Sequence, residues 1–227
     1  MVGRPRSRAE RLNLDAVLAA AVELADSEGL DALSMRAVAR RLGVEAMSLY
    51  HHVANKEALL DGMVDTVFTE FHAPEPGGDW RSETRARSVT ARAALKRHPW
   101  AVGLMDSRRN AGYRTLVHHN AVIGCLREAG FSLALTGHAF AVLDAHLYGF
   151  LIQELALPFE PGQDLAELGE HVVAALPEGE LPYFREFTLE HALQPGYDFG
   201  DEFEVGLDLV LDGLAERRAV EQSASGG

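Results

Sequence analysis

Hydrophobic residues recur along the chain at intervals of three and four positions, which is the spacing of one face of an α-helix. The first such stripe comprises Leu14, Val17, Leu18, Ala21, Leu24 and Ala25. Asn13 is a favourable N-cap for this helix, and Gly29 is expected to end it. No segment sustains the alternation of hydrophobic and polar residues that is typical of a half-buried strand. The pattern therefore predicts an all-α fold.

Three further helices are expected before the first long loop. The second helix runs from Ser34, a favourable N-cap, to Gly43. A short third helix follows at about residues 45–51, and Asn55 then caps a fourth. The hydrophobic stripe of this fourth helix comprises Leu60, Met63, Val64, Val67, Phe68 and Phe71.

The clearest break in the chain is the Pro/Gly loop HAPEPGGD at residues 72–79. It predicts two helical domains, joined near this loop and flanked by a short arm and a tail. The expected divisions are an arm at 1–11, an N-terminal domain at 12–71 with a helix-turn-helix at about 33–52, a larger domain at 79–220, and a disordered tail at 221–227. Helices in the larger domain are expected near 80–97, 98–107, 110–130, 132–157, 163–176, 181–194 and 199–218.

Composition narrows the class of protein. With 47% hydrophobic and 24% charged residues, the 227-residue chain can bury a core. We find no apolar run near the roughly 20 residues that a membrane span requires, so no membrane partner is expected. The single cysteine, Cys125, excludes an intrachain disulfide and a multi-thiolate zinc site, and it favours the reducing cytoplasm.

The net charge of −13 argues at first against a nucleic-acid partner. Its distribution changes that interpretation, because residues 1–60 balance eight basic against eight acidic side chains and the remainder carries the whole negative charge. Four arginines and one acid lie within the first eleven residues. A basic arm before an acidic remainder is expected when only one end of a protein meets phosphate. The alternative is an ordinary solvated N-terminus.

The second and third helices form a helix-turn-helix, a motif whose second helix enters the DNA major groove. Gly43 suits the turn because glycine adopts positive φ without steric cost. Leu49 and Val53 face inward, and the positions left outward are Ala46, Met47, Ser48, Tyr50, His51 and His52. Met47 can touch a thymine methyl group, and the polar side chains can bind phosphates or base edges. Lys56 adds its charge to a helix N-terminus, a favourable pairing for phosphate. A plain surface helix is the alternative.

The segment LSMRAVARRLGVEAMSLYHHVANKEALLDGM, residues 33–63, resembles the N-terminal domain of the tetracycline-repressor (TetR) family of bacterial transcriptional regulators. The alanine-rich helix, LGV, LY and NKEALL occur in order and at matching spacing, and the resemblance extends over residues 14–70. It implies a homodimer that binds a palindromic operator, usually as a repressor, and is released by a small-molecule effector.

The resemblance also implies which residues meet DNA. The arm would contribute Arg4, Arg6 and Arg8, and the domain would contribute Ser34, Arg36, Ala46, Met47, Ser48, Tyr50, His51, His52 and Lys56. Ala46 and Met47 are apolar where the family faces bases, so direct hydrogen-bond readout is expected to be sparse.

The larger domain of this family binds the effector and forms the dimer. Candidate pocket residues mix apolar surface with a few polar groups on helices that should converge, although each could be an ordinary core residue. They are Trp100, Leu104, Met105, Tyr113, His118, Phe140, Leu143, His146, Leu147 and Phe150. Two long helices, 132–157 and 199–218, are expected to form a four-helix dimer interface. The fourth helix, 55–71, would link effector binding to DNA binding.

Other function classes are less well supported. His118 and His119 are sequential and diverge by about 100° on a helix, whereas His138, Asp144 and His146 could share one face. No HExxH, CxxC, G-x-S-x-G or phosphate-binding loop occurs, so neither catalytic residues nor a metal site are expected. By analogy with the tetracycline repressor, one alternative is a divalent ion that binds together with a chelating effector. No other cofactor is expected. An adaptor protein, the third class, would show no salt-sensitive DNA binding.

Overall fold

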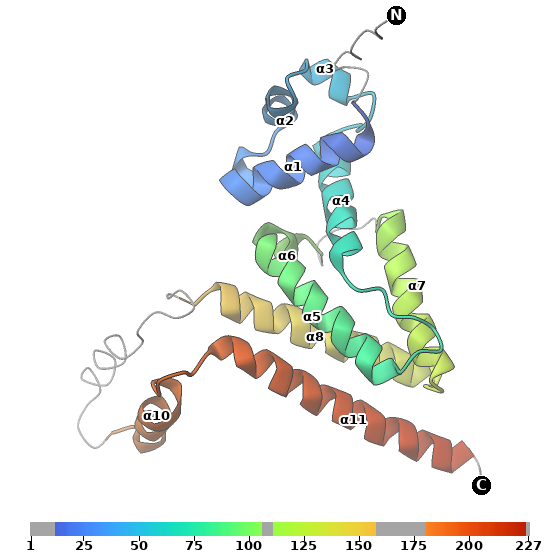
Figure 1. The fold of residues 1–227 in the computed structure, drawn as a ribbon, viewed down its shortest axis with the longest axis vertical. Coiled ribbons are helices and arrows are strands. Elements are labelled where there is room, and N and C mark those ends of the chain that lie inside the picture. Colours follow the sequence, from blue (N-terminus) through green and yellow to red (C-terminus); the bar gives the residue numbers. More distant parts are fainter. Residues whose placement is uncertain (1–11, 106–110, 158–179, 226–227) are drawn as a thin grey trace, which may run out of the picture.

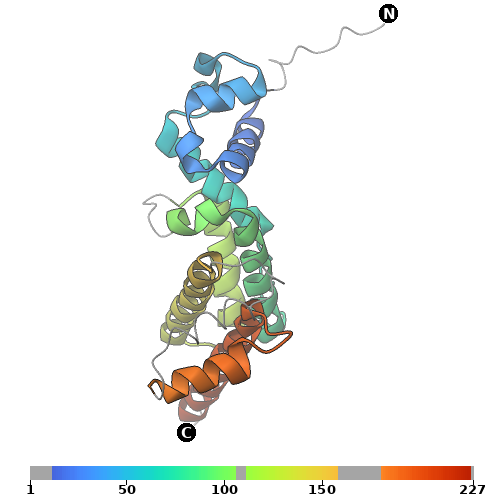
Figure 2. The same ribbon diagram turned by 90° about the vertical axis from the view of Figure 1, so that its left-hand side faces the viewer.

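The computed structural model describes residues 12–105, 111–157 and 180–225, and every regular element in these ranges is helical. The predicted arm with Arg4, Arg6 and Arg8 and the predicted helix at 163–176 lie outside the described residues. Figure 1 shows a small head at one end of the molecule and a larger helical body at the other, with α4 (Lys56–Val67) connecting them. Figure 2, a view from the side, gives the same arrangement.

The head consists of α1 (Leu14–Glu28), α2 (Met35–Leu42), α3 (Ala46–Leu49) and the first half of α4. Three of its helices begin at the side chains that the sequence indicated. Asn13 accepts a hydrogen bond from the Ala16 amide at 2.8 Å, and Asn55 accepts one from the Ala58 amide at 2.8 Å. Ser34 caps α2 in the same way at 3.2 Å. A 3-10 turn at Leu30–Ala32 links α1 to α2.

Helix α4 belongs to two hydrophobic cores. Leu59 and Met63, both with no exposed surface, lie in the core of the head. Val67 and Phe68, one turn further on, lie in the core of the body. A 3-10 turn at Phe68–Glu70 ends the connection. Displacement of α4 therefore disturbs the packing of both parts.

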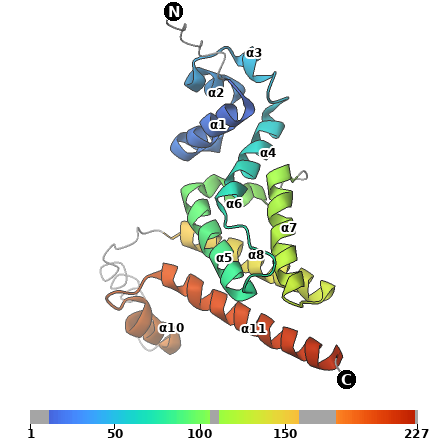
Figure 3. The ribbon, with the colours of Figure 1, turned by 45° about the vertical axis from the view of Figure 1, so that its right-hand side comes forward.

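The body contains α5 (Trp80–Arg97), α6 (Pro99–Met105), α7 (Tyr113–Glu128), α8 (Leu133–Leu155) and α11 (Glu202–Ser225). Helix α5 packs on α8, α8 packs on α11, and α7 packs on α4 and α8. Figure 3 shows α11 crossing the end of the body that is remote from the head. A shorter helix, α10 (Pro182–Phe187), continues as a π turn at Thr188–Ala192, and a 3-10 turn at Phe199–Asp201 leads into α11.

The prediction of a disordered tail from residue 221 is wrong for most of that segment, because α11 continues to Ser225. Contacts between the end of α11 and residues earlier in the chain explain why the helix continues. Ser132 donates a hydrogen bond to Glu221 at 3.0 Å, and Arg218 donates one to the Ala129 carbonyl at 3.2 Å. The Arg218 guanidinium also lies over the rings of Trp80 and Phe131. These contacts hold the last turns of α11 against the α7–α8 corner.

Helix α8 is the one helix among the described residues that is long and apolar enough, by length and composition, to cross a membrane. It packs on α5, α7 and α11, and its buried positions include Leu143 and Leu147. Such a helix is equally typical of the core of a helical body.

Candidate functional site

The turn between α2 and α3 presents α3 at the end of the head. Gly43 has φ 69° and ψ 36°, the left-handed conformation expected at this position, and its N–H bonds the carbonyls of Ala39 and Arg40. Val44 then donates to the Ala39 carbonyl at 3.0 Å, which completes the helix ending. The third helix is shorter than the predicted 45–51, with four residues followed by turns to His52. It is attached by Leu49 and Val53, which are 0% and 4% exposed.

The predicted DNA-contacting residues of α3 differ in exposure. Met47 is 72% exposed and Tyr50 is 46% exposed, although both are large and apolar or aromatic. His51 is exposed, whereas Ser48 and His52 are half-buried. Ala46 is also half-buried and packs against the core of the head. The exposed part of this segment is thus formed by one side of a very short helix and the turn after it.

Basic and polar groups surround α3. Arg36 and Lys56 are exposed, at the first turns of α2 and α4. Ser34 is exposed too, and its oxygen accepts the Ala37 amide, so its hydroxyl proton can still be donated to a phosphate. Arg40 is a further exposed cation that the motif comparison did not single out. Arg41 is engaged differently, because its guanidinium pairs with Glu23 at 3.3 Å.

Carboxylates on α1 and α4 connect these helices to the body. Asp26 of α1 accepts hydrogen bonds from Trp100 Nε1 at 2.6 Å and lies 2.8 Å from His98 Nδ1. The other ring nitrogen of His98 lies 3.1 Å from Glu70. Burial raises the pKa of Glu70, but hydrogen bonds from Arg97 and His98 outweigh it and hold the pKa below its usual value. Asp65 of α4 makes the second connection, to the start of α7.

The predicted effector residues fall into separate regions. Trp100 and Leu104 pack against both cores at the junction of head and body, and Met105 packs against the body core. Tyr113 is 80% exposed at the start of α7. Leu143 and Leu147 are ordinary core residues, at 1% and 0% exposure. The remaining four residues, His118, Phe140, His146 and Phe150, lie in or beside two clusters that contain charged side chains.

The first cluster, here called the Arg87 cluster, consists of Arg87, His118 and Asp144. Arg87 is 2% exposed, and its guanidinium lies 2.7 Å from the Asp144 carboxylate. Its Nε donates to His118 Nε2 at 3.4 Å. His118 is 3% exposed, and its Nδ1 forms no hydrogen bond with the parts of the chain that the structure describes. Burial, assisted by the charge of Arg87, lowers the pKa of His118 to about 3, so the imidazole is neutral at pH 7.

Aromatic rings surround the Arg87 cluster. The rings of Phe68 and Phe71 each lie 5.6 Å from that of His118. His119 lies 5.6 Å from Phe68 and 5.1 Å from Phe140 in edge-to-face geometry. Arg87 is not among the residues expected from the sequence, although the sequence carries a signal for it. Thr84, Arg87, Ser88 and Ala91 are spaced as one buried helix face. An arginine on such a face needs a specific partner.

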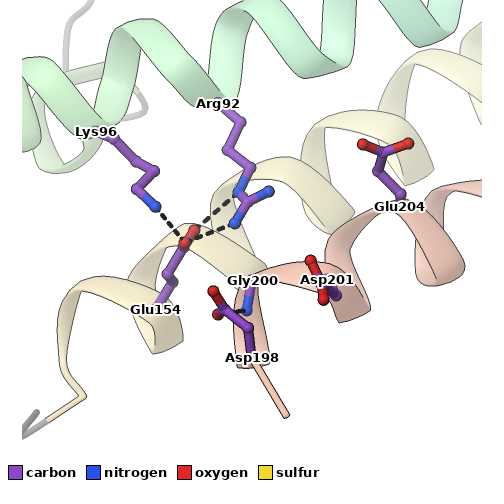
Figure 4. A pocket seen from close by; sticks show the side chains of 7 residues that line it. All are labelled: Arg92, Lys96, Glu154, Asp198, Gly200, Asp201 and Glu204. Atoms are coloured by element: carbon purple, nitrogen blue, oxygen red, sulfur yellow. Dashed lines mark hydrogen bonds and ion pairs between the residues drawn. The ribbon is translucent and has the colours of Figure 1, made fainter. Parts of the chain in front are cut away.

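The second cluster lies where α5, α8 and α11 meet. His146 donates to the Phe203 carbonyl at 3.0 Å and stacks on the Phe203 ring, while Phe150 stacks on Phe199. Arg92 lies over the rings of Phe150 and Phe203 and pairs with Glu154 at 2.6 Å. Figure 4 shows Arg92 and Lys96 of α5 converging on Glu154 of α8. They border a pocket of about 360 Å³ whose other lining residues are Asp198, Gly200, Asp201 and Glu204.

Among residues 12–105, 111–157 and 180–225, no group of three or more His, Cys, Asp or Glu side chains has a metal-binding arrangement. His138 is exposed, Asp144 pairs with Arg87, and His146 donates to a backbone carbonyl. The three residues that the sequence left open as a cluster therefore do not converge.

Two family profiles match the chain over most of its length. The profile for "Bacterial regulatory proteins, tetR family" matches residues 17–63. The profile for "Tetracyclin repressor-like, C-terminal domain" matches residues 73–218. The gap between the two matches, residues 64–72, contains the end of α4 and the 3-10 turn after it, here together called the α4 connection.

Individual proteins give the same result. An HTH-type transcriptional regulator of Saccharopolyspora erythraea is 39% identical over 214 residues, covering 92% of this chain and 87% of that protein. The HTH-type transcriptional repressor DrrR1 of Streptomyces coeruleorubidus is 33% identical, covering 95% of this chain and 84% of its own. Apo ActR from Streptomyces coelicolor superposes with a TM-score of 0.77 at 26% identity, covering 92% of this chain and 98% of ActR.

Proposed function

The chain belongs to the tetR family of bacterial regulatory proteins, and we propose that it is a homodimeric transcriptional repressor released from a palindromic operator by a small-molecule effector. The family consists of transcriptional regulators, so the chain acts by binding and not by catalysis. Its site of action is the cytoplasm, where bacterial DNA lies.

The observation that carries this proposal is the exposure of α3. A four-residue helix held by Leu49 and Val53 leaves Met47 and Tyr50 in solvent without a covering element among the described residues. The major groove is wide enough to admit an α-helix, and α3 lies at the end of the head where no other helix would block its entry. We assign base contacts to the outward residues of α3 and of the turns that follow it, within residues 46–52.

Phosphate contacts are assigned to the groups that flank α3. Ser34, Arg36 and Lys56 lie at the N-terminal turns of α2 and α4, where helix dipole and side-chain charge act together on an anion. Arg40 joins them as an exposed cation on α2. The arm with Arg4, Arg6 and Arg8 is proposed to contact the adjacent backbone or minor groove.

The dimer is proposed to form through α8 and α11, which pack on each other and leave large apolar side chains exposed. Those side chains are Leu133, Val142, Ile152, Leu155, Val205, Leu209 and Val220. Apolar surface of this kind on two adjacent long helices is typical of a four-helix interface. The two heads would then face successive half-sites about one helical turn apart.

The effector is proposed to bind in the body, between the Arg87 cluster and the rings around it. ActR has been crystallised in complex with actinorhodin, which supports a small-molecule effector for this chain as well. The cluster touches Phe68 at the end of the α4 connection, so a ligand there can bias the position of α4. A coupling of about 1–3 kcal/mol between the two sites would be typical.

The test of the proposed function is selection of DNA from a randomised duplex pool by the purified full-length protein, followed by sequencing. We expect an enriched palindrome with half-sites about one helical turn apart, bound by a dimer. Failure to enrich any sequence at low ionic strength, with protein that is folded and dimeric, would contradict the assignment of this chain as an operator-binding repressor.

A further inference from the structure

His98 connects three parts of the chain. It lies between α5 and α6 in the body, and it is 7% exposed. Its Nδ1 lies 2.8 Å from Asp26 of α1, and its Nε2 lies 3.1 Å from Glu70 of the α4 connection. The backbone is fixed as well, because the His98 N–H donates to the Ala94 carbonyl at 3.0 Å and its carbonyl accepts the Ala101 amide at 2.9 Å. The imidazole is therefore held between a helix of the head and the segment that joins head and body.

The two contacts of this ring require two protons. Aspartate and glutamate side chains ordinarily ionise near pH 4, about two units below histidine, and an ionised carboxylate can only accept a hydrogen bond. A neutral imidazole has one N–H and one lone pair, whereas an imidazolium has two N–H groups. Both carboxylates can accept from His98 at the same time only when the ring carries its second proton. Without that proton, one carboxylate faces a nitrogen lone pair at 2.8 or 3.1 Å.

The charges around His98 favour the second proton. Glu70 also pairs with Arg97. Asp26 also accepts from Trp100 Nε1 at 2.6 Å, but an indole is neutral, so among the described residues the imidazolium supplies the positive charge opposite Asp26. Two carboxylates, one guanidinium and one imidazolium balance, whereas a neutral ring leaves one negative charge uncompensated. The two carboxylate side chains are 29% and 33% exposed, so water screens this charge only in part.

We propose that His98 is a proton-dependent latch between head and body. The imidazolium ties α1 to the α4 connection, and loss of one ring proton opens one of the two contacts and loosens the head. Histidine ordinarily changes its charge between about pH 5 and pH 8, so this latch responds to pH in the physiological range. Operator binding then depends on pH through a residue of the body that lies outside the helix-turn-helix. The inference goes beyond the proposed function, because it adds a response to pH that needs no effector.

The indole of Trp100 provides a direct probe of the latch. The chain contains two tryptophans, so ¹⁵N-labelled tryptophan gives two indole signals in an NMR spectrum. Trp100 donates to the same Asp26 oxygen that faces His98, whereas Trp80 lies at the opposite end of α5. Both signals are measured in the full-length protein from pH 6.0 to pH 8.5, a range of about 2.5 units that begins near the ordinary histidine value. We expect the Trp100 signal to follow one titration and the Trp80 signal to stay constant.

Two substitutions imitate the two states of the ring. His98→Gln can donate to one carboxylate and never carries a charge, like the neutral imidazole. His98→Arg carries a permanent charge and several N–H donors, like the imidazolium. Both should abolish the titration of the Trp100 signal. His138→Gln, at an exposed position on α8, is the matched control and should leave that titration unchanged.

Operator affinity shows whether the latch acts on DNA binding. It is measured for wild-type protein and both His98 variants at pH 6.0 and pH 8.5, with a duplex selected from the randomised pool. We expect wild-type protein to match His98→Arg at pH 6.0 and His98→Gln at pH 8.5. The two variants should differ at least threefold, which corresponds to about 0.7 kcal/mol. His51 and His52 can also change charge in this range, but all three proteins contain them, so their effect cancels in the comparison.

A Trp100 signal that does not change with pH in wild-type protein would overturn the proposal, because His98 then keeps one protonation state. A titration that persists in His98→Gln, or equal operator affinity of the two variants, would overturn it too. Melting temperatures and the Trp80 signal verify that each variant is folded, and the wild-type titration needs neither variant. If no duplex is selected, the proposed function fails, whereas the indole titration still decides whether His98 changes its protonation state between α1 and the α4 connection.

Discussion

The carboxylate of Asp65 on α4 caps the first turn of α7 through Thr115, accepting its backbone N–H at 2.7 Å and its hydroxyl at 2.9 Å. The Arg114 amide donates to the same carboxylate at 3.2 Å. An N-cap is normally the residue that precedes the helix, but here it comes from the helix that connects head and body. The start of α7, which also carries His118, is therefore tied directly to the element that positions α3.

Replacement of Asp65 by alanine is expected to weaken this connection. Loss of the cap should lower the free energy of unfolding by about 1–2 kcal/mol, measured by urea denaturation at fixed dimer concentration. It should also reduce the factor by which an effector weakens operator binding, because α7 no longer displaces α4. Asp65→Asn keeps an acceptor oxygen, so it should lose less unfolding free energy and less of the effector's influence on operator binding than Asp65→Ala. Equal coupling in Asp65→Ala and wild-type protein would show that the signal travels elsewhere.

The second prediction concerns the contribution of the buried Arg87–Asp144 pair to stability. Arg87→Met leaves a largely buried carboxylate without its cation and should cost about 3–5 kcal/mol of stability. Arg87→Met combined with Asp144→Leu removes both charges and should recover much of that loss. The measurement is a double-mutant cycle in urea. Strictly additive losses would mean that the two side chains do not interact in solution.

Acid should destabilise the protein through His118. Its pKa is about 3 in the folded chain and near 6.5 in the unfolded chain, so below pH 6.5 the unfolded state binds the additional proton. Stability from this group is present above pH 6.5 and falls as the pH falls toward 3. The loss is about 1.4 kcal/mol per pH unit, or about 2 kcal/mol at pH 5.

The matched control for this titration is His118→Asn, which cannot be protonated in that range. Arg87, Asp144, His119 and His72 surround the imidazole and remain in the variant, so their own titration contributes to both proteins. The difference in unfolding free energy between the two proteins should shrink between pH 7 and pH 5. A constant difference would mean that His118 is protonated in the folded state or accessible to water.

Salt dependence tests the assignment of phosphate contacts. Arg36→Ala should reduce the slope of log affinity against log salt by about 0.9 for each protomer, because one phosphate contact is lost. Arg41 offers a comparison on the same helix, since its guanidinium already pairs with Glu23. Arg41→Ala should change the slope less. The slopes come from fluorescence anisotropy of a labelled operator between 50 and 300 mM salt, a range of about sixfold that spans physiological ionic strength.

Local sequence rules predicted the head well. Asn13, Ser34 and Asn55 cap helices as expected, and Gly43 has the left-handed conformation that the turn requires. These features depend on side chain and backbone within a few residues, so the sequence contains what determines them. The third helix is shorter than predicted because its fully buried anchors are Leu49 and Val53, while Met47, Tyr50 and His51 are exposed and add little packing.

The body was less predictable because helical periodicity identifies a face without identifying its partner. Tyr113 and Leu143 were grouped with His118, yet one is exposed and another lies in the core. Arg87 and Asp65 were not singled out, because their partners are 57 and 50 residues away along the chain. The sequence predicts a disordered tail where α11 continues, since no feature of the tail itself indicates that Ser132 binds Glu221.

The proposed contact between the exposed side of α3 and operator DNA is best tested by the operator affinity of Met47→Glu. Met47 is 72% exposed, so the substitution should leave melting temperature and dimerisation unchanged while bringing a negative charge to each half-site. Leu116→Glu, at a 54% exposed position on α7, adds the same charge to the body and not to α3. We expect operator affinity to fall about 100-fold or more in Met47→Glu, on the order of 1–3 kcal/mol per half-site, and less than threefold in Leu116→Glu. Equal affinity of Met47→Glu and wild-type protein for the selected operator would contradict it.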